Sequence, residues 1–199
     1  MQELLKFSAL RRFTKALSVA LHERDPYTRF HCERVINLAT EIGIACALPD
    51  HDLVLLGVSA SFHDVGKIGI PDNVLLKPGK LDDDEWEIMK THSERGERIM
   101  RATLLQDAPA VASVIRHHHE YFDGGGYPDG LAGDGIPMLS RILSMADSYD
   151  AMATVRAYHR PRTHNEIVEV MRSEVNRKFD PALFAHFAAV IEKSPSRLK

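Results

Sequence analysis

Cysteine is scarce in this sequence, with Cys32 and Cys46 the only two among 199 residues. Two cysteines without CxxC spacing form no disulfide framework, so we expect reduced thiols, as in the cytosol. Apolar runs long enough to span a membrane are also missing. The first residues lack the basic-then-apolar order of a signal peptide. These absences predict a soluble, cytoplasmic protein with no membrane segment in this sequence.

An excess of one charge is missing as well, because 25 lysines and arginines face 28 acidic residues, for a net charge of −3 at pH 7. This balance argues against a general nucleic-acid binder, and we expect no DNA partner. A phosphate ligand remains compatible with it, since a metal ion or a local cation can reverse the sign of the charge inside a cleft. The length suits one domain with a substantial core.

Apolar residues recur at steps of three and four almost throughout, whereas the alternation expected of β-strands is scarce. A first helix is expected to end near Asp25, and glycines and prolines separate the later helices. These later helices are predicted at about residues 27–46, 50–64, 82–99, 108–121, 140–158, 165–175 and 181–191. The pattern predicts a single all-α domain without repeats or a dividing linker.

Histidine is abundant, with eleven copies, and it commonly serves as a metal ligand or an acid–base group. His63 and Asp64 begin the segment HDVGKIGIP. Neighbouring helical residues diverge by about 100°, so such a pair can serve one metal ion or bridge two. Lys67 follows His63 by one helical turn, where its ammonium would hold a phosphoryl oxygen. For the pair alone, a helix C-terminus capped by histidine is the more common explanation.

A second motif, HHEYFDGGGYP, occupies residues 118–128. Together with HDVGK, it resembles the HD-GYP phosphodiesterases, a branch of the HD superfamily of metal-dependent phosphohydrolases. The resemblance extends from about Asp25 to Ile191 and includes the segments DPYTRFHCERV, LLKPGKL, EWEIMKTH, IPMLSRIL, ADSYDA and FDP.

The resemblance implies a single HD-type helical bundle with a GYP loop and C-terminal helices. It assigns residues 25–199 to the catalytic domain and residues 1–24 to an N-terminal helix that connects to a sensor or receiver domain. The implied metal ligands are His31, His63, Asp64, His92, His118, His119 and Asp147. Imidazole and carboxylate ligands suit two divalent ions, iron or manganese first and nickel or zinc as alternatives. Asp64 would bridge the two ions.

Substrate contacts are implied at Lys67, Arg156 and His159, and at Gly126 and Tyr127 of the GYP loop. Asp64 and Lys67 are the expected catalytic residues. The GYP loop has two interpretations that the sequence does not separate, the lip of the cleft and the contact site of a signalling partner. His117 precedes the motif and is expected at the surface or behind the ligands.

Three positions depart from the family pattern. Some members carry a glutamate at the position of Tyr27, where it helps to hold a third metal ion, so this chain is expected to hold two. His159 stands where arginine or lysine is usual, and a mostly neutral histidine would weaken phosphate binding. Residues 176–178 replace a segment that tends to contain glycine, and we have no functional interpretation of that change.

The implied reaction belongs to bacterial second-messenger signalling, with hydrolysis of cyclic diguanylate to the linear dinucleotide; whether a second cut to GMP follows is left open. One alternative is another cyclic dinucleotide such as cyclic GMP-AMP, because none of the motif residues reads a base. A phosphohydrolase of mononucleotides or guanosine tetraphosphate is a second alternative, which the full GYP motif disfavours. A third is a metal-binding signalling module without turnover, which the His159 substitution keeps open.

Overall fold

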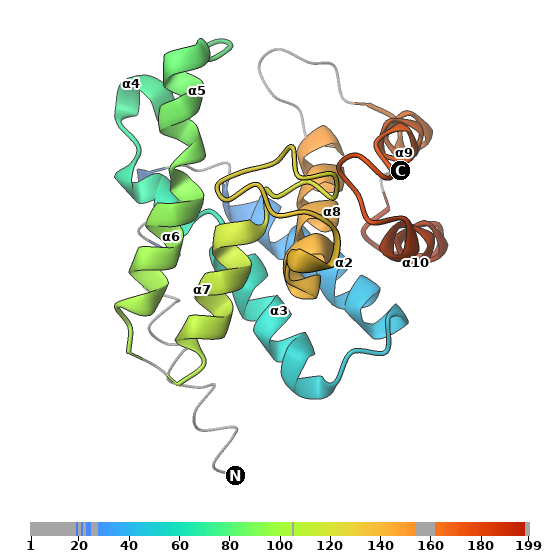
Figure 1. Cartoon of the computed structure of the whole chain (residues 1–199). Helices are drawn as coiled ribbons and strands as arrows, with labels where there is room; N and C mark the ends of the chain where they lie inside the picture. Colours follow the sequence, from blue (N-terminus) through green and yellow to red (C-terminus); the bar gives the residue numbers. More distant parts are fainter. Residues whose placement is uncertain are drawn as a thin grey trace.

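The computed structural model describes residues 19, 21, 23–24, 28–104, 106–153 and 162–197, with the backbone alone at residues 28–30. Its helices, drawn in Figure 1, are α2 (Thr28–Ala45), α3 (Asp50–Phe62), α4 (Asp72–Leu75), α5 (Asp83–Lys90), α6 (His92–Arg101), α7 (Ala108–His117), α8 (Met138–Ala153), α9 (His164–Ser173) and α10 (Pro181–Ile191). Two 3-10 helices join them, η1 (Val65–Gly69) and η2 (Gly133–Gly135). Over these ranges the only β-type pairings are two isolated bridges, so the predicted all-α fold is confirmed.

Helix starts follow local capping chemistry. Asp82 accepts the backbone N–H of Glu85, and the Glu85 side chain accepts the backbone N–H of Asp82, which forms a capping box at α5. Thr163 and Glu166 form the same arrangement at α9. Asp180 caps α10, with Pro181 in the first turn, where its missing N–H costs nothing. These caps explain why the starts of α5, α9 and α10 were close to the predicted ones.

The single helix predicted over residues 82–99 is wrong, because α5 ends at Lys90 and α6 begins at His92. The Thr91 hydroxyl donates to the Ile88 carbonyl, 2.7 Å away, and accepts from Arg95. Local side-chain bonds of this kind compete with the helical ladder. The break gives His92 a position at the start of a helix.

Other helix boundaries also differ from the predicted ones. The helix predicted to reach residue 121 ends at His117, and α4 was not predicted. α8 begins directly after Pro137 and is described as far as Ala153, so the predicted extension to residue 158 lies outside the described residues. The first predicted helix falls largely outside them too. None of the described helices is long and apolar enough to cross a membrane.

Two apolar clusters hold the bundle together. The larger joins α2, α8, α9 and α10, and includes Leu38, Leu143 and Phe187. The smaller joins α3, α6 and α7 through residues such as Phe62 and Met100. Each fully buried side chain of this size stabilises the fold by about 1.5–3 kcal/mol. Figure 1 shows α2, α3 and α8 at the centre, with α5 to α7 on one side and α9 and α10 on the other.

Candidate metal centre

The His63–Asp64 pair lies where α3 ends and η1 begins. His63 keeps helical backbone angles as the last residue of the turn, and Asp64 follows with φ −92° and ψ 0°. Gly66 comes next because η1 crosses α6 at very close range. A Cβ on Gly66 would lie 1.8 Å from the His92 carbonyl oxygen. This glycine therefore permits the contact that brings His92 beside Asp64.

The seven predicted ligands come from five places in the fold. His31 lies on α2, Asp147 on α8 and His92 at the first turn of α6, while His118 and His119 follow the end of α7. Four of the five predicted histidine ligands are buried, with exposed fractions of 2% or less, and His119 is partly buried. The packing of α2 against α8 brings His31 and Asp147 together, although more than one hundred residues separate them in the sequence.

The ligand atoms gather in two groups whose members lie within 4.8 Å of one another. The groups are His31–His63–Asp147 and His92–His118–His119. Asp64 stands between them. One of its carboxylate oxygens lies 3.6 Å from Nε2 of His63, and the other lies 3.8 Å from Nε2 of His92. A carboxylate with one oxygen toward each group has the placement of a bridging ligand.

The tautomers of the imidazoles fit a metal site. Nδ1 of His63, His92 and His118 faces a backbone carbonyl oxygen three residues earlier, at 2.8, 2.8 and 2.6 Å. Each Nδ1 must therefore carry the proton, which leaves Nε2 with its lone pair toward the cluster. Among the described residues, the buried Nε2 of His118 has no hydrogen-bond partner. A buried imidazole nitrogen with an unshared lone pair is suited to bind a cation.

The distances between the Nε2 atoms of facing histidines also fit a metal site. Nε2 of His31 lies 3.3 Å from Nε2 of His63, and Nε2 of His119 lies 3.2 Å from Nε2 of His92. Metal–nitrogen bonds of about 2.0–2.1 Å at tetrahedral or octahedral angles place two ligand nitrogens roughly 3.0–3.4 Å apart. The residues present therefore fit a pair of divalent ions.

Burial and opposite charges shift the pKa values of the cluster. Burial alone would raise the pKa of Asp64, but Lys67 and the nearby histidines hold it well below its usual range. Burial and the neighbouring histidines lower the pKa of His118 to about 3. Burial opposes the charged form of His31, yet Asp147 and Asp150 outweigh it and raise its pKa to about 10. The carboxylates are thus kept ionised, as metal ligands must be.

Asp150 and Arg34 support one ligand from behind. Oδ2 of Asp150 lies 2.7 Å from Nδ1 of His31. Arg34 donates to the same carboxylate through Nε at 2.5 Å and Nη2 at 3.0 Å. The carboxylate orients the His31 ring and increases the basicity of Nε2. Neither residue was singled out from the sequence, although both lie within segments that resemble the family.

The GYP loop is held over the cluster by Glu120. Its two carboxylate oxygens accept the backbone N–H groups of Asp129, at 2.7 Å, and Leu131, at 3.1 Å. Arg116 forms a two-pronged ion pair with Asp129, at 2.7 and 2.6 Å. This hydrogen-bonded pair lowers the pKa of Asp129 to about 2. Glu120 was not predicted to have a role, although the HHE motif contains it.

Tyr127 and Gly126 lie directly against the ligands. The Tyr127 ring stacks on the His119 ring, with centroids 4.8 Å apart, and meets the Trp86 ring edge-on. A Cβ on Gly126 would lie 2.2 Å from the backbone nitrogen of Tyr121, so only glycine fits there. Both residues therefore lie beside the candidate ligand His119.

The remaining predicted site residues divide into two sets. Nζ of Lys67 lies 2.7 Å from Oδ2 of Asp64, beside the bridging position. Arg156 and His159 lie outside the described residues, as does Tyr27. His117 faces Asp129 at 2.9 Å and belongs to neither ligand group, in agreement with the sequence interpretation.

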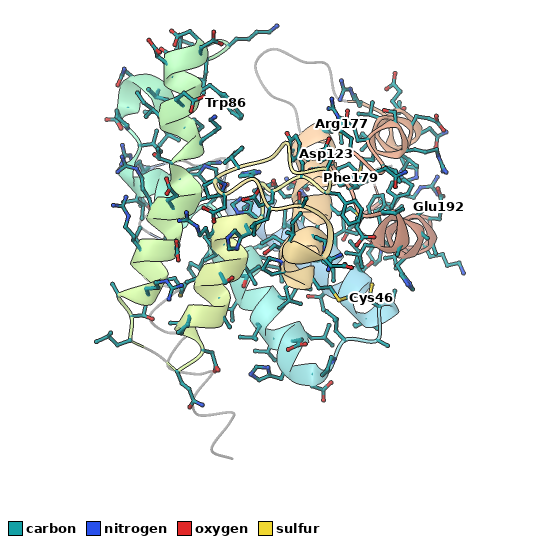
Figure 2. All side chains as sticks on the ribbon, in the orientation of Figure 1. Cys46, Trp86, Asp123, Arg177, Phe179 and Glu192 are labelled. Carbon is teal, nitrogen blue, oxygen red and sulfur yellow. The ribbon has the colours of Figure 1, made fainter. Side chains whose placement is uncertain are left out.

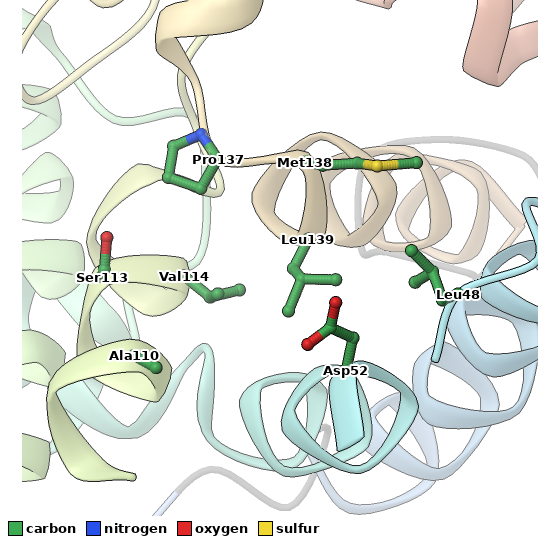
Figure 3. A pocket seen from close by; sticks show the side chains of 8 residues that line it. All are labelled: Leu48, Asp52, Ala110, Ser113, Val114, Pro137, Met138 and Leu139. Atoms are coloured by element: carbon green, nitrogen blue, oxygen red, sulfur yellow. The ribbon is translucent and has the colours of Figure 1, made fainter. Parts of the chain in front are cut away.

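A separate pocket of about 280 Å³ lies between α3, α7 and the start of α8. Figure 3 shows the eight residues that line it, Leu48, Asp52, Ala110, Ser113, Val114, Pro137, Met138 and Leu139. None of them is a predicted site residue, and Asp52 is the one with a charged side chain. The pocket is mostly apolar and takes no part in the metal centre.

Comparison with known proteins identifies the class. The model of the HD domain family matches residues 15–183, and the chain belongs to this family. The family is metal-dependent, in keeping with the two ligand groups. This match, together with relatives named as cyclic dinucleotide phosphodiesterases, confirms the resemblance to the HD-GYP branch.

Two curated relatives illustrate the similarity. The cyclic di-GMP phosphodiesterase response regulator RpfG of Xanthomonas campestris pv. campestris is 36% identical over 165 residues, which cover 83% of this chain and 44% of that protein. The 3'3'-cGAMP-specific phosphodiesterase 2 of Vibrio cholerae is 38% identical over 170 residues, covering 84% and 32%. The chain thus spans less than half the length of these relatives.

Solved structures share the fold at lower identity. A cyclic GMP-AMP specific phosphodiesterase of V. cholerae, V-cGAP3, superposes with a TM-score of 0.65 at 21% identity, covering 83% of this chain and 44% of that one. The HD domain of the phosphodiesterase PgpH of L. monocytogenes, in complex with cyclic-di-AMP, gives 0.62 at 15% identity, covering 87% and 93%.

Proposed function

We propose that this chain is a metal-dependent phosphodiesterase that hydrolyses cyclic diguanylate to the linear dinucleotide, with a second cut to GMP as the alternative end point. One observation carries the proposal: two groups of three ligands with the Asp64 carboxylate between them. The ammonium of Lys67 beside that carboxylate adds a cation for a phosphoryl oxygen. Relatives named as cyclic dinucleotide phosphodiesterases, at 36% and 38% identity, support the substrate class.

The cofactor would be two divalent ions, iron or manganese, with nickel or zinc as alternatives. The residues that would hold them are His31, His63 and Asp147 on one side, His92, His118 and His119 on the other, and Asp64 between. Such ions lower the pKa of a water molecule and neutralise charge that develops on the phosphate. All ligands are nitrogen or oxygen atoms, which suits a catalytic rather than a structural site.

The side chains around the cluster would bind and orient the dinucleotide. Lys67 would donate to a non-bridging phosphoryl oxygen, where its charge stabilises the transition state more than the ground state. Gly126 and Tyr127 would form the wall of the cleft, because Tyr127 stacks on His119. Arg156 would supply further positive charge, and the mostly neutral His159 would contact the phosphate more weakly.

Which bases the cyclic dinucleotide substrate carries is a separate question. Among the relatives, one named for cyclic di-GMP is 36% identical and one named for cGAMP is 38% identical, so overall similarity does not favour either substrate. A direct comparison of kcat/KM for cyclic diguanylate and cyclic GMP-AMP, with products followed by chromatography, decides it. We expect the higher value for cyclic diguanylate.

The matched control is Asp64→Ala, which removes the bridging carboxylate without touching the core of α3. We expect it to abolish turnover of both substrates. Metal-loaded wild-type protein that hydrolyses neither dinucleotide would instead favour a signalling module that binds metal without turnover. Turnover equal to wild type in the variant would point to a contaminating enzyme.

The number of ions is a separate part of the proposal, since Tyr27 replaces the glutamate that some family members use for a third metal ion. Elemental analysis of anaerobically purified protein should give two ions per chain. Three tightly bound ions would refute this part and leave the reaction itself unaffected.

Residues 1–24 are proposed to connect the domain to a regulatory module. The length of the relatives, of which this chain covers 44% and 32%, supports this arrangement. A signalling protein that contacts the GYP loop is the other proposed partner. Cross-linking of the full-length protein in cells, with and without a substitution of Tyr127, would identify such a contact.

A further inference from the structure

Lys178 lies in the short segment between α9 and α10, which is fastened to the GYP loop. The backbone N–H of Phe122 donates to the Lys178 carbonyl, 3.2 Å away, and that of Asp123 donates to the Arg177 carbonyl, 2.9 Å away. Figure 2 shows Asp123, Arg177 and Phe179 gathered where the two segments meet. The side chain of Lys178 therefore starts from the edge of the same loop that covers the ligands.

The Lys178 side chain is partly buried, and its ammonium lies beside two aromatic rings with no anionic partner at contact distance. Nζ lies 5.4 Å from the centroids of both the Tyr121 and the Phe179 rings. Within the described ranges, no carboxylate lies within 4 Å of Nζ and no acceptor receives a hydrogen bond from it. An enclosed, unpaired charge is costly, and its retention needs a reason beyond packing.

The charge of Lys178 interacts electrostatically with residues of the ligand cluster. Burial lowers the pKa of Lys178, and Asp147 is the carboxylate that opposes this effect most strongly. Burial and the adjacent histidines lower the pKa of His119, and the charge of Lys178 adds to that lowering. Asp147 and His119 belong to different ligand groups, so the ammonium acts on both halves of the centre.

Its neighbour Arg177 is different in each respect. The Arg177 guanidinium lies 2.7 Å from a Glu174 carboxylate oxygen, and 62% of its side chain is exposed. Arg177 is thus a solvated ion pair on the surface, which contributes little. Two consecutive cations therefore have opposite environments, and only Lys178 has a charge that a ligand at the cluster could neutralise.

We propose that the Lys178 ammonium binds a phosphate oxygen of the cyclic dinucleotide and positions it over the ligand groups. This inference rests on the proposed function, because it requires a phosphate-containing substrate in the cleft. A cation from this segment would also compensate for the positive charge that is lost at position 159, where His159 replaces the arginine or lysine usual in the family. The aromatic rings of Tyr121 and Phe179 would hold the ammonium in place before the substrate arrives.

Two variants separate this role from a structural one. Lys178→Met keeps the length and the apolar stem but removes the charge, and Lys178→Arg keeps the charge. Arg177→Met is the matched control, since it removes an adjacent cation that is already paired. The measurements are KM and kcat for cyclic diguanylate, the dissociation constant of its hydrolysis-resistant phosphorothioate analogue, metal content and melting temperature.

The expected result is a rise of about tenfold or more in both KM and the analogue's dissociation constant for Lys178→Met, as for loss of a charge-assisted hydrogen bond. Lys178→Arg should restore both values to within about threefold, and Arg177→Met should leave them unchanged. Metal content should stay at the wild-type value. The melting temperature of Lys178→Met should equal or exceed that of wild type, because an unpaired enclosed charge is removed.

Values of KM and of the dissociation constant within twofold of wild type in Lys178→Met would overturn the inference, whatever the melting temperature. A wild-type protein that neither binds the analogue nor hydrolyses cyclic diguanylate would instead overturn the proposed function, and the assignment of Lys178 with it. The two failures are therefore distinguished by the wild-type measurements alone.

Discussion

Single hydrogen bonds decide which atoms face the metal centre. Backbone carbonyls hold Nδ1 of His63, His92 and His118, so that Nε2 points inward in each case. His31 differs, because its Nδ1 faces the Asp150 carboxylate rather than a carbonyl. An anionic partner makes the ring a stronger donor to a cation than a neutral carbonyl does. Among these four histidines, His31 should therefore contribute most to metal affinity.

Asp150→Asn tests this supporting role. The substitution keeps the shape of the side chain but removes the charge that faces His31 and Arg34. We expect metal affinity to fall by about tenfold to a hundredfold. Competition with a chromophoric chelator gives the dissociation constant without any need for turnover.

Asp134→Asn serves as its control, because the Asp134 side chain is 97% exposed and its ion pair is with Arg141 rather than with a candidate ligand. It should bind metal as tightly as wild type. Equal affinity in all three proteins would show that the His31–Asp150 contact does not tune the site.

The residue types of the site were predictable from the sequence, whereas their supports were not. The two motifs contain His63, Asp64, His118 and His119, and the further segments that resemble the family implied His31, His92 and Asp147. Asp150, Arg34 and Lys178 gave no comparable signal. Their importance comes from contacts across α2, α8 and the segment after α9, and such contacts depend on packing that spacing alone does not reveal.

Close crossings between elements set the position of the ligands. η1 passes so near α6 that Gly66 has no room for a side chain, and the same contact places His92 near Asp64. Helical periodicity could not predict this crossing, nor the break at Thr91 that starts α6 at His92. Both depend on which backbone atoms meet in the folded molecule.

A matched pair of glycine substitutions tests the crossing. Gly66→Ala should destabilise the fold by about 3 kcal/mol, because the new methyl group would strike the His92 backbone. Gly57→Ala should stabilise α3 by up to about 1 kcal/mol, since a Cβ there meets no atom within 4 Å and alanine favours the helix. Denaturant unfolding measures both. A neutral Gly66→Ala would contradict the close approach of η1 and α6.

The loop between α7 and α8 depends on Glu120. In Glu120→Gln one acceptor oxygen becomes an NH₂ group, which cannot accept the N–H of Asp129 or Leu131. We expect hydrogen exchange at those two amides to accelerate by about tenfold, as for the loss of one charge-assisted bond. The amide of Gly133, which donates to the Phe122 carbonyl, is the internal reference and should exchange as before. Unchanged exchange at all three amides would mean that other contacts hold the loop.

The whole molecule is a helical bundle that closes long sequence separations around one centre. The all-α class and most helix positions were predictable, because the apolar period reports which residues face the core. The meeting of α2, α3, α6, α7 and α8 at one point was not, since periodicity carries no information on which helices become neighbours. The family resemblance supplied that information before the structure did.

If this protein hydrolyses cyclic diguanylate by a metal-dependent reaction, its turnover of that dinucleotide must depend on bound metal. We would therefore measure turnover before and after metal removal. The protein is stripped with a chelator, reloaded anaerobically with manganese or iron, and assayed for the linear dinucleotide by chromatography. We expect no product from the stripped protein and restored turnover at two bound ions per chain. Equal turnover in the stripped protein, or none in protein that holds two ions, would contradict it.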